Sequence, residues 1–179
     1  MIAAMLTPHS HLSDATLLAE VAAMSADDRR AVVKAYVGQR ANRRHKPGRG
    51  LERVNYRFEV VADYGAFRDL QRHRMMTIEW QNLTPHHGYL RPDEVDAADA
   101  TEAYDRAMAT SAGLHDALAR KFPDRAAYAV ALGYRVRFVM NLNAREAMHL
   151  TELRSAPQGH ASYRVVAQQM HRLIGEQAG

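Results

Sequence analysis

Hydrophobic and polar residues alternate with a period of two along three segments of the chain, and each segment is a predicted strand. The strands are expected over residues 54–60, 76–81 and 134–140. Alternation of this kind sends every second side chain to one face, so each strand should be half buried. On the third strand the polar face carries Arg135 and Arg137. These two would suit a phosphate contact or the outer face of an edge strand, and we favour the edge.

Apolar residues at helical spacing predict helices before, between and after these strands. Ser13 begins one that runs to Met24, and Ser25 begins a second that Gly38 ends, with Asp28 completing a capping box. The remaining helices are expected over residues 64–73, from about Asp96 to Lys121, from Asp124 onward, over 141–154 and over 163–174. The pattern predicts an α+β fold that is mostly helical and contains no internal repeat.

The composition fits one packed domain over residues 1–179. Hydrophobic residues make up 47% of the chain and charged residues 25%, a balance that excludes disordered and fibrous proteins. The absence of cysteine excludes thiolate catalysis, zinc–thiolate sites and iron–sulfur clusters. No apolar run approaches the roughly 20 residues of a membrane-spanning helix, and the opening segment is too short and polar for a secretory signal. We therefore expect a cytoplasmic protein that binds no membrane.

Two polar segments are the candidates for chemistry. Arg72, His73 and Arg74 crowd together at the junction between a predicted helix and a predicted strand, which indicates either a phosphate-binding site or a solvated run of charge. The predicted helix over 141–154 carries polar residues on two faces. Such a helix lines a site, bridges subunits or lies exposed on the surface. The net charge of +4 favours an anionic ligand without identifying one.

The basic loop and the histidine pairs indicate no specific ligand, and several common binding motifs are absent from the chain. Residues 39–50 join five Arg and Lys with a proline and two glycines, so this segment is a basic loop, either solvated or covering a ligand. It has no aromatic residue for base stacking, and we expect no nucleic acid partner. Histidines occur in close pairs at His9 and His11 and at His86 and His87, but neither pair has a third ligand at diagnostic spacing, so no metal site is predicted. The chain contains no P-loop, dinucleotide-binding glycine motif or nucleophile elbow.

The order of these segments resembles the flavin-dependent thymidylate synthases. In that family a Leu-Glu-His strand leads through a helix to an Arg-His-Arg motif and a second strand, and a later Asn-x-Arg helix ends in Leu-Arg. The matching segments are residues 51–81 and 141–154, and the resemblance extends over about residues 45–175. It implies helices around a mixed central β-sheet, preceded here by the helices of residues 1–38. It also implies a homo-oligomer, a tetramer or dimer, in which FAD lies where these two segments meet across a subunit boundary.

The resemblance also implies a reaction and roles for individual residues. The reaction is the reductive methylation of dUMP with methylene-tetrahydrofolate and a nicotinamide reductant such as NADPH. The cofactor-binding positions are Arg72, His73, Arg74, Asn143, Arg145 and His149. Arg154 is similar to the arginine that activates the pyrimidine ring, where a fixed guanidinium would stabilise negative charge. The substrate-binding positions are Thr77, Glu79 and Asn82.

The chain departs from the family pattern where the nucleotide phosphate should bind. The arginine expected to grip this phosphate is missing, and Asp69 stands where a glutamine normally helps to hold dUMP. The leading hypothesis is therefore an FAD-binding flavoprotein with an altered nucleotide-phosphate site. One alternative is an active synthase in which another cation replaces the lost arginine, the candidates being Arg135, Arg137, Arg43, Arg44, Lys46 and Arg49. The other is a non-catalytic scaffold that contributes an oligomer interface. Because the chain ends early for the family, we expect a domain of a longer protein.

Overall fold

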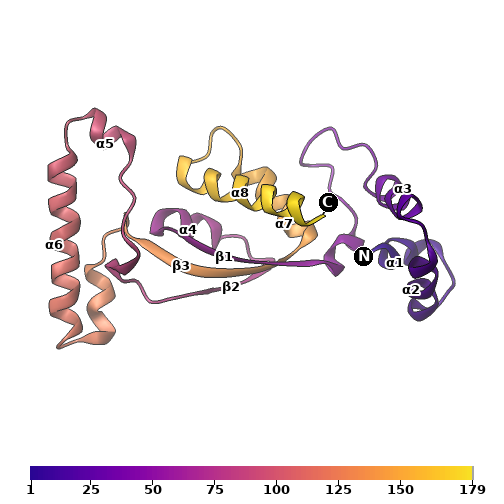
Figure 1. Cartoon of the computed structure of the whole chain (residues 1–179), viewed down its shortest axis with the longest axis horizontal. Coiled ribbons are helices and arrows are strands. Elements are labelled where there is room, and N and C mark those ends of the chain that lie inside the picture. The colour runs from indigo at the N-terminus through magenta and orange to yellow at the C-terminus, as the bar shows by residue number, and fades with distance from the viewer. Residues whose placement is uncertain (179) are drawn as a thin grey trace.

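A three-stranded sheet forms the centre of the computed structural model, which describes residues 1–178 (Figure 1). Strand β1 is Asn55–Asp63, β2 is Met76–Trp80 and β3 is Arg135–Asn143. β3 lies between the other two strands and runs antiparallel to both. The predicted α+β class is confirmed, but the neighbouring strands are antiparallel rather than mixed. β3 is also central rather than the expected edge strand, because it hydrogen-bonds to a neighbour on each side.

One face of the sheet is covered by helices. Helices α4 (Tyr64–Leu70), α7 (Ala144–Arg154) and α8 (Ala161–Ala178) pack over this face (Figure 1). Four side chains of β3 point into the resulting core and are at most 1% exposed: Val136, Phe138, Met140 and Leu142. The opposite face carries charged residues, including an ion pair between Arg137 and Glu59. This division confirms the half-buried strands that the alternation predicts.

Each of the two long strands passes directly into a helix that its last residue caps. Asp63 accepts a hydrogen bond from the backbone N–H of Ala66 at 2.9 Å and starts α4. Asn143 accepts one from the N–H of Glu146 at 2.9 Å and starts α7, so the helix predicted over 141–154 begins after Asn143. Because β1 and β3 run in opposite directions, α4 and α7 start at opposite ends of the sheet and return over the same face. The segment that follows α4 therefore reaches α7.

The helices at the start of the chain begin where their caps predict. Helices α2 (Asp14–Ala23) and α3 (Ala26–Val37) start after Ser13 and Ser25, whose hydroxyls accept backbone N–H groups of the first turn. A short helix that the sequence pattern does not predict, α1 (Ile2–Leu6), precedes them.

The helices between β2 and β3 differ from the expectation. The segment 96–121 contains parts of two helices, α5 (Asp93–Ala97) and α6 (Thr101–Ala119), because Asp99 adopts a positive φ of 53° that interrupts the helical path. The next expected helix is the 3-10 helix η4 (Pro123–Ala129).

Figure 1 shows the sheet in the middle of an elongated molecule, with α1 to α3 at one end and α5, α6 and η4 at the other. The remaining 3-10 helices are η1 (Thr7–His9), η2 (Arg49–Arg53) and η3 (Pro85–His87). Within residues 1–178, no helix combines the length and apolar character that a bilayer crossing requires.

Candidate functional site

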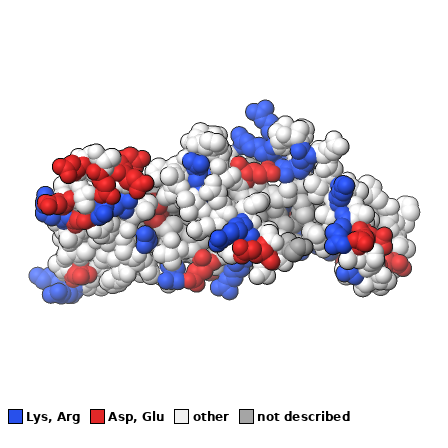
Figure 2. All heavy atoms as spheres, turned by 45° about the horizontal axis from the view of Figure 1, so that its top comes forward, with Lys and Arg blue, Asp and Glu red and all other residues white. Residues whose placement is uncertain are grey.

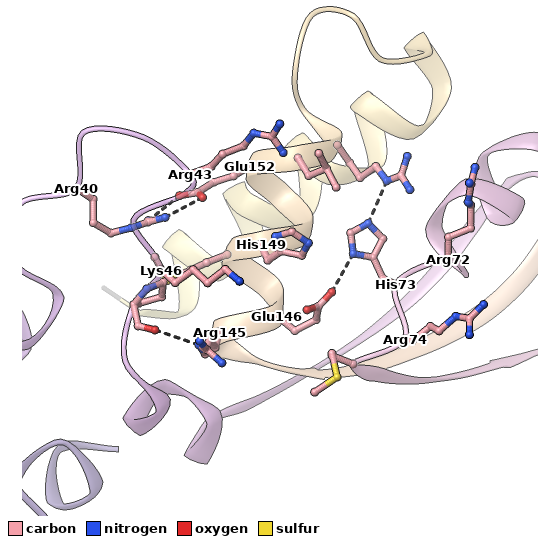
Figure 3. A pocket seen from close by; sticks show the side chains of 15 residues that line it. Arg40, Arg43, Lys46, Arg72, His73, Arg74, Arg145, Glu146, His149 and Glu152 are labelled. Carbon is pink, nitrogen blue, oxygen red and sulfur yellow. Dashed lines mark hydrogen bonds and ion pairs between the residues drawn. The ribbon is translucent and has the colours of Figure 1, made fainter. Parts of the chain in front are cut away.

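A pocket of about 400 Å³ lies between helix α7, the segment that joins α4 to β2, and the basic loop after α3 (Figure 3). Seven lining residues come from α7, four from residues 72–75 and four from the loop 39–50. Figure 3 shows the loop side chains on one side of α7 and those of the 72–75 segment on the other. Three segments far apart in the sequence thus meet around one hollow. Of the roles left open for the 141–154 helix, the structure shows the helix lining a pocket, and a bridge between subunits stays a prediction.

Positive charge dominates this pocket. Seven of its lining residues are Lys or Arg and two are Glu, whereas the whole chain carries a formal charge of only +4. In Figure 2, basic side chains gather over the loop between α3 and η2, while acidic side chains gather at the end that carries α5. Clefts lined by one sign of charge attract ions of the other sign. The pocket is therefore suited to an anion.

One ion pair and one hydrogen bond to the backbone hold the basic loop beside α7. Both terminal nitrogens of Arg40 donate to the carboxylate of Glu152, at 2.6 and 2.9 Å. From α7, Nε of Arg145 donates to the carbonyl oxygen of Pro47 at 3.0 Å. A two-point guanidinium–carboxylate contact fixes direction as well as distance. The loop is therefore a wall of the pocket rather than a freely solvated segment.

The Glu52 carboxylate accepts hydrogen bonds from two guanidinium groups beside the pocket. Arg145 donates to it at 2.9 Å, and Arg49 donates at 3.1 to 3.2 Å. These contacts, that of Arg49 first, lower the pKa of the Glu52 carboxyl below its ordinary value. Glu52 therefore stays ionised near neutral pH, and its negative charge offsets the positive charge of Arg145.

Three cations of the pocket remain uncompensated. The side chains of Arg43, Lys46 and Arg74 make no hydrogen bond or ion pair with any residue from 1 to 178. Arg72 comes no nearer than 3.6 Å to a carboxylate, that of Asp69, and its side chain is 75% exposed. Unpaired cations around a concave surface are the donors that a phosphate group would use.

A buried hydrogen-bond chain lies at the base of the pocket and joins Glu146, His73 and Arg154. Nδ1 of His73 lies 2.8 Å from Oε1 of Glu146, and Nε of Arg154 lies 3.0 Å from Nε2 of His73 (Figure 3). Arginine can only donate, so Nε2 must accept and the ring proton must lie on Nδ1, where it is donated to the carboxylate. The side chains of His73 and Glu146 are only 4% and 9% exposed. This chain of bonds fixes one tautomer of His73 and one direction for the guanidinium.

Further contacts hold Arg154 from its other sides. Its Nη2 donates to the backbone oxygen of Asp69 at 2.8 Å, and the Asp69 carboxylate lies 3.7 Å from Nη1. The ring of Tyr163 on α8 faces the guanidinium carbon at 5.1 Å, a cation–π distance. Arg154 is consequently 15% exposed and held in place while still lining the pocket.

Most of the residues predicted to bind a cofactor line this one pocket. They are Arg72, His73, Arg74, Arg145 and His149, together with the predicted catalytic Arg154. The convergence of the two segments across a subunit boundary stays a prediction, but the segments already meet within one chain, where His73 bonds Glu146 and Arg154. The topology explains this, since α4 and α7 return over the same face of the sheet.

The other predicted positions lie outside the main pocket. Asn143 uses its side-chain oxygen to cap α7. It borders a neighbouring hollow of about 360 Å³ together with Thr77, and this hollow shares Arg74 and Met75 with the main pocket. Of the other two substrate-binding predictions, Glu79 is exposed on β2 and Asn82 is exposed in the loop after it, and the structure brings neither to the pocket.

Glu146 and Arg40 are among the lining residues that the sequence prediction misses. Glu146 stands three residues before His149 on the same helix, a spacing that could have indicated a shared face. Arg40 gives no such signal, because its partner Glu152 lies 112 positions away.

The comparisons with known proteins agree with this fold. The chain is 40% identical over 165 residues to a UPF0159 protein of Chlamydia pneumoniae, covering 92% of this chain and 31% of that protein. It is 37% identical over 160 residues to a UPF0159 protein of Thermoplasma acidophilum, covering 88% and 32%. The chain therefore spans about a third of the length of these curated relatives.

A solved structure shows the same arrangement of elements. The UMP/dUMP methylase PolB of Streptomyces cacaoi, crystallised with 5-Br dUMP, superposes with a TM-score of 0.72 over 98% of this chain and 85% of that one, at 16% sequence identity. This likeness shows the fold alone. The family model of the thymidylate synthase complementing proteins matches residues 2–178. The chain thus belongs to the thymidylate synthase complementing protein family.

Proposed function

We propose that this chain forms the cofactor-binding and catalytic part of a flavin-dependent methylase that acts on a uridine nucleotide. The observation that carries the proposal is Arg154, held in a buried hydrogen-bond chain at the base of a pocket with three unpaired cations. Family membership and the fold shared with a dUMP methylase support the same reaction class. Because the curated relatives are about three times longer, the activity of the whole protein is part of the proposal.

The donor set of the pocket fits FAD. Its diphosphate would find Arg74, which has no partner among residues 1–178, and Arg72, whose side chain is 75% exposed. The main pocket and its neighbour share Arg74 and Met75, so an elongated dinucleotide could extend from one hollow into the other. Both ring nitrogens of His73 are already bonded within the chain. His73 would therefore meet a cofactor only through its ring carbons and would act chiefly by holding Arg154. When bound, the flavin would supply the redox chemistry and carry the transferred carbon.

Arg154 is proposed to stabilise negative charge on the pyrimidine ring. A guanidinium has five N–H groups, of which the structure uses one for His73 and one for the Asp69 carbonyl. The remaining N–H groups make no hydrogen bond within residues 1–178, although Nη1 lies 3.7 Å from the Asp69 carboxylate, and they could donate to a substrate carbonyl. Donors fixed in advance stabilise a developing charge without reorganising during the reaction. The chain contains no cysteine, and this role for Arg154 requires no protein nucleophile.

The nucleotide phosphate is proposed to bind the basic loop. Among the candidates for replacing the missing family arginine, Arg137 is paired with Glu59 and Arg49 with Glu52, whereas Arg43 and Lys46 line the pocket without partners. This difference favours an active enzyme with a rearranged phosphate site over one that has lost its nucleotide. Methylene-tetrahydrofolate and NADPH are the proposed co-substrates. A second copy of the chain, as a dimer or tetramer, is proposed to complete the site.

The test combines binding with turnover. The purified protein should bind FAD as a yellow complex of one FAD per chain and convert dUMP or UMP to its methylated product with methylene-tetrahydrofolate and NADPH. FAD binding without nucleotide binding would instead support a flavoprotein with an altered nucleotide site. Binding of neither ligand by a folded oligomer would overturn the proposal in favour of a scaffold. Sedimentation with and without FAD tests the proposed oligomer.

A further inference from the structure

A second cluster of potential ligands lies away from the pocket, where η3 meets α6. His86, His115 and Asp116 each place one nitrogen or oxygen atom within 4.8 Å of the others. The sequence offers no third ligand near the pair His86 and His87, and the fold supplies two from a helix that begins 15 residues further along the chain. This cluster plays no part in the proposed methylase site.

The geometry leaves one nitrogen of His115 available to a ligand. The side chain of His115 is 8% exposed, and its Nδ1 lies 3.0 Å from Oδ1 of Asp116. Its Nε2 has no hydrogen-bond partner within residues 1–178, yet it is not among the fully buried unpaired atoms, so solvent reaches it. The His86 ring stands edge-on to the His115 ring at 5.9 Å between centroids. A carboxylate that orients one imidazole beside a second imidazole is the usual surrounding of a metal-bound histidine.

The surrounding charge favours a metal ion at this cluster over a similar group of three side chains in the pocket. His73, Glu146 and His149 also lie within ligand distance of one another, but Arg154 donates directly to His73 and other cations line the same wall. A metal ion there would meet repulsion at close range. At the second cluster no Lys or Arg pairs with any of the three side chains among residues 1–178, and Asp116 contributes a negative charge.

We propose that the imidazoles of His86 and His115 bind one divalent transition metal ion, with Zn²⁺ as the expected ion, and that Asp116 orients His115 through Nδ1. Imidazole ligands suit this class of ion, and water would complete the coordination. The segment after η3 is already joined to α6 further along, where Tyr89 donates to Asp105 at 2.7 Å and Tyr104 donates to the Leu90 carbonyl at 2.8 Å. The metal ion would join the two elements at the His86 end, so it would stabilise this part of the fold rather than take part in catalysis.

The test uses the full chain without a histidine tag, titrated with Zn²⁺ by calorimetry and by thermal unfolding. One ion should bind per chain and raise the midpoint of unfolding. His86→Ala should abolish this binding, and Asp116→Asn should weaken it by roughly 10- to 100-fold. His86 and Asp116 are exposed, so both variants should fold. Co²⁺ in place of Zn²⁺ should give a visible absorption band that reports ligation directly.

Two matched controls make the assignment specific. His87→Ala removes the adjacent histidine, which contacts Gln81 instead, and should bind Zn²⁺ as the wild type does. His149→Ala disables the pocket cluster and should also leave binding unchanged. Absence of Zn²⁺ binding by the wild type, unchanged binding by His86→Ala, or loss of binding in His149→Ala would each overturn the proposed site. None of these outcomes depends on FAD or on turnover.

Discussion

Nε of Arg154 donates a hydrogen bond to Nε2 of His73 at 3.0 Å. This bond is compatible only with a histidine that keeps its proton on Nδ1, and Glu146 supplies the acceptor for that proton at 2.8 Å. The carboxylate thus acts on Arg154 through the imidazole, although no hydrogen bond joins the Glu146 and Arg154 side chains directly. Glu146 is in this sense a positioning residue for the proposed catalytic arginine.

Glu146→Ala should destabilise the protein and impair Arg154 together. Removal of the acceptor leaves the buried Nδ1–H of His73 unpaired, which costs about 1–3 kcal/mol in the free energy of unfolding. The free energy is measured by urea denaturation. Glu146→Gln keeps an oxygen that can accept the same bond and should recover most of the stability. Equal losses in the two variants would show that the hydrogen bond to His73 is not what Glu146 contributes.

Arg154→Lys should retain FAD and lose turnover. Lysine keeps the charge, but it lacks the planar fork that contacts His73 and the Asp69 carbonyl at once. The loss of one preorganised donor lowers kcat by roughly 100- to 1,000-fold, measured as methylation of the nucleotide under saturating substrate. FAD affinity should be unchanged, because the unpaired cations are elsewhere. A turnover within tenfold of the wild type would remove Arg154 from the chemical step.

The unpaired loop cations should carry ligand affinity. Arg43→Ala and Lys46→Ala should each weaken nucleotide binding by roughly fivefold, which corresponds to about 1 kcal/mol, and the loss should shrink as salt is added. Arg44→Ala is the matched control, because Arg44 belongs to the same loop without lining the pocket. Equal effects at all three positions would indicate a general charge effect rather than a site.

Local signals in the sequence predict the parts of this fold that depend on local physics. Ser25 caps its helix as predicted by accepting from the N–H of Asp28, and its hydroxyl donates to the Asp28 carboxylate, because a cap needs only residues within one turn. The alternation in β3 is likewise correct in its buried and exposed faces. The position of β3 in the middle of the sheet is not predictable in this way, since strand order depends on long-range pairing.

The candidate site, too, has parts that the sequence predicts and parts that depend on long-range contacts. Arg72 to Arg74 and the face of α7 that includes Arg145 and His149 are visible in the sequence as crowded polar groups. Their meeting within one chain follows from the direction in which α4 and α7 cross the sheet, which no local pattern encodes. The basic loop is recognisable by composition, but its attachment through Arg40 and Glu152 joins residues 112 positions apart.

Arg40→Ala should free the basic loop. The pair that Arg40 makes with Glu152 is largely shielded, with side-chain exposures of 16% and 34%, so its loss should ease loop opening by about 1 kcal/mol, or roughly fivefold. Limited trypsin digestion should then cut faster after Arg43 and Arg44. Arg30→Ala, which removes an exposed pair with Asp27, should leave that rate unchanged. Equal cleavage in Arg40→Ala and the wild type would mean that the tether does not restrain the loop.

Acid should remove a contribution that Asp105 makes to stability. The hydroxyl of Tyr89 and the guanidinium of Arg91 donate to this carboxylate and hold its pKa below the ordinary value, Tyr89 having the larger effect. A carboxyl whose pKa is lower in the folded than in the unfolded state stabilises the fold above the unfolded value, about 3.9, and loses that effect as the pH falls through the folded value. Asp105→Asn should therefore be less stable than the wild type near pH 7 in urea denaturation.

The difference between wild type and Asp105→Asn should narrow as the pH drops below about 4. Tyr89→Phe removes the principal donor and should show a weaker version of the same pH dependence, because Arg91 still pairs with the carboxylate. The two contacts join the segment after η3 to α6, so the loss should be matched by faster hydrogen exchange in residues 89–91. A difference between wild type and Asp105→Asn that stays constant from about pH 7 to about pH 3 would contradict the lowered pKa and assign the effect of the variant to packing.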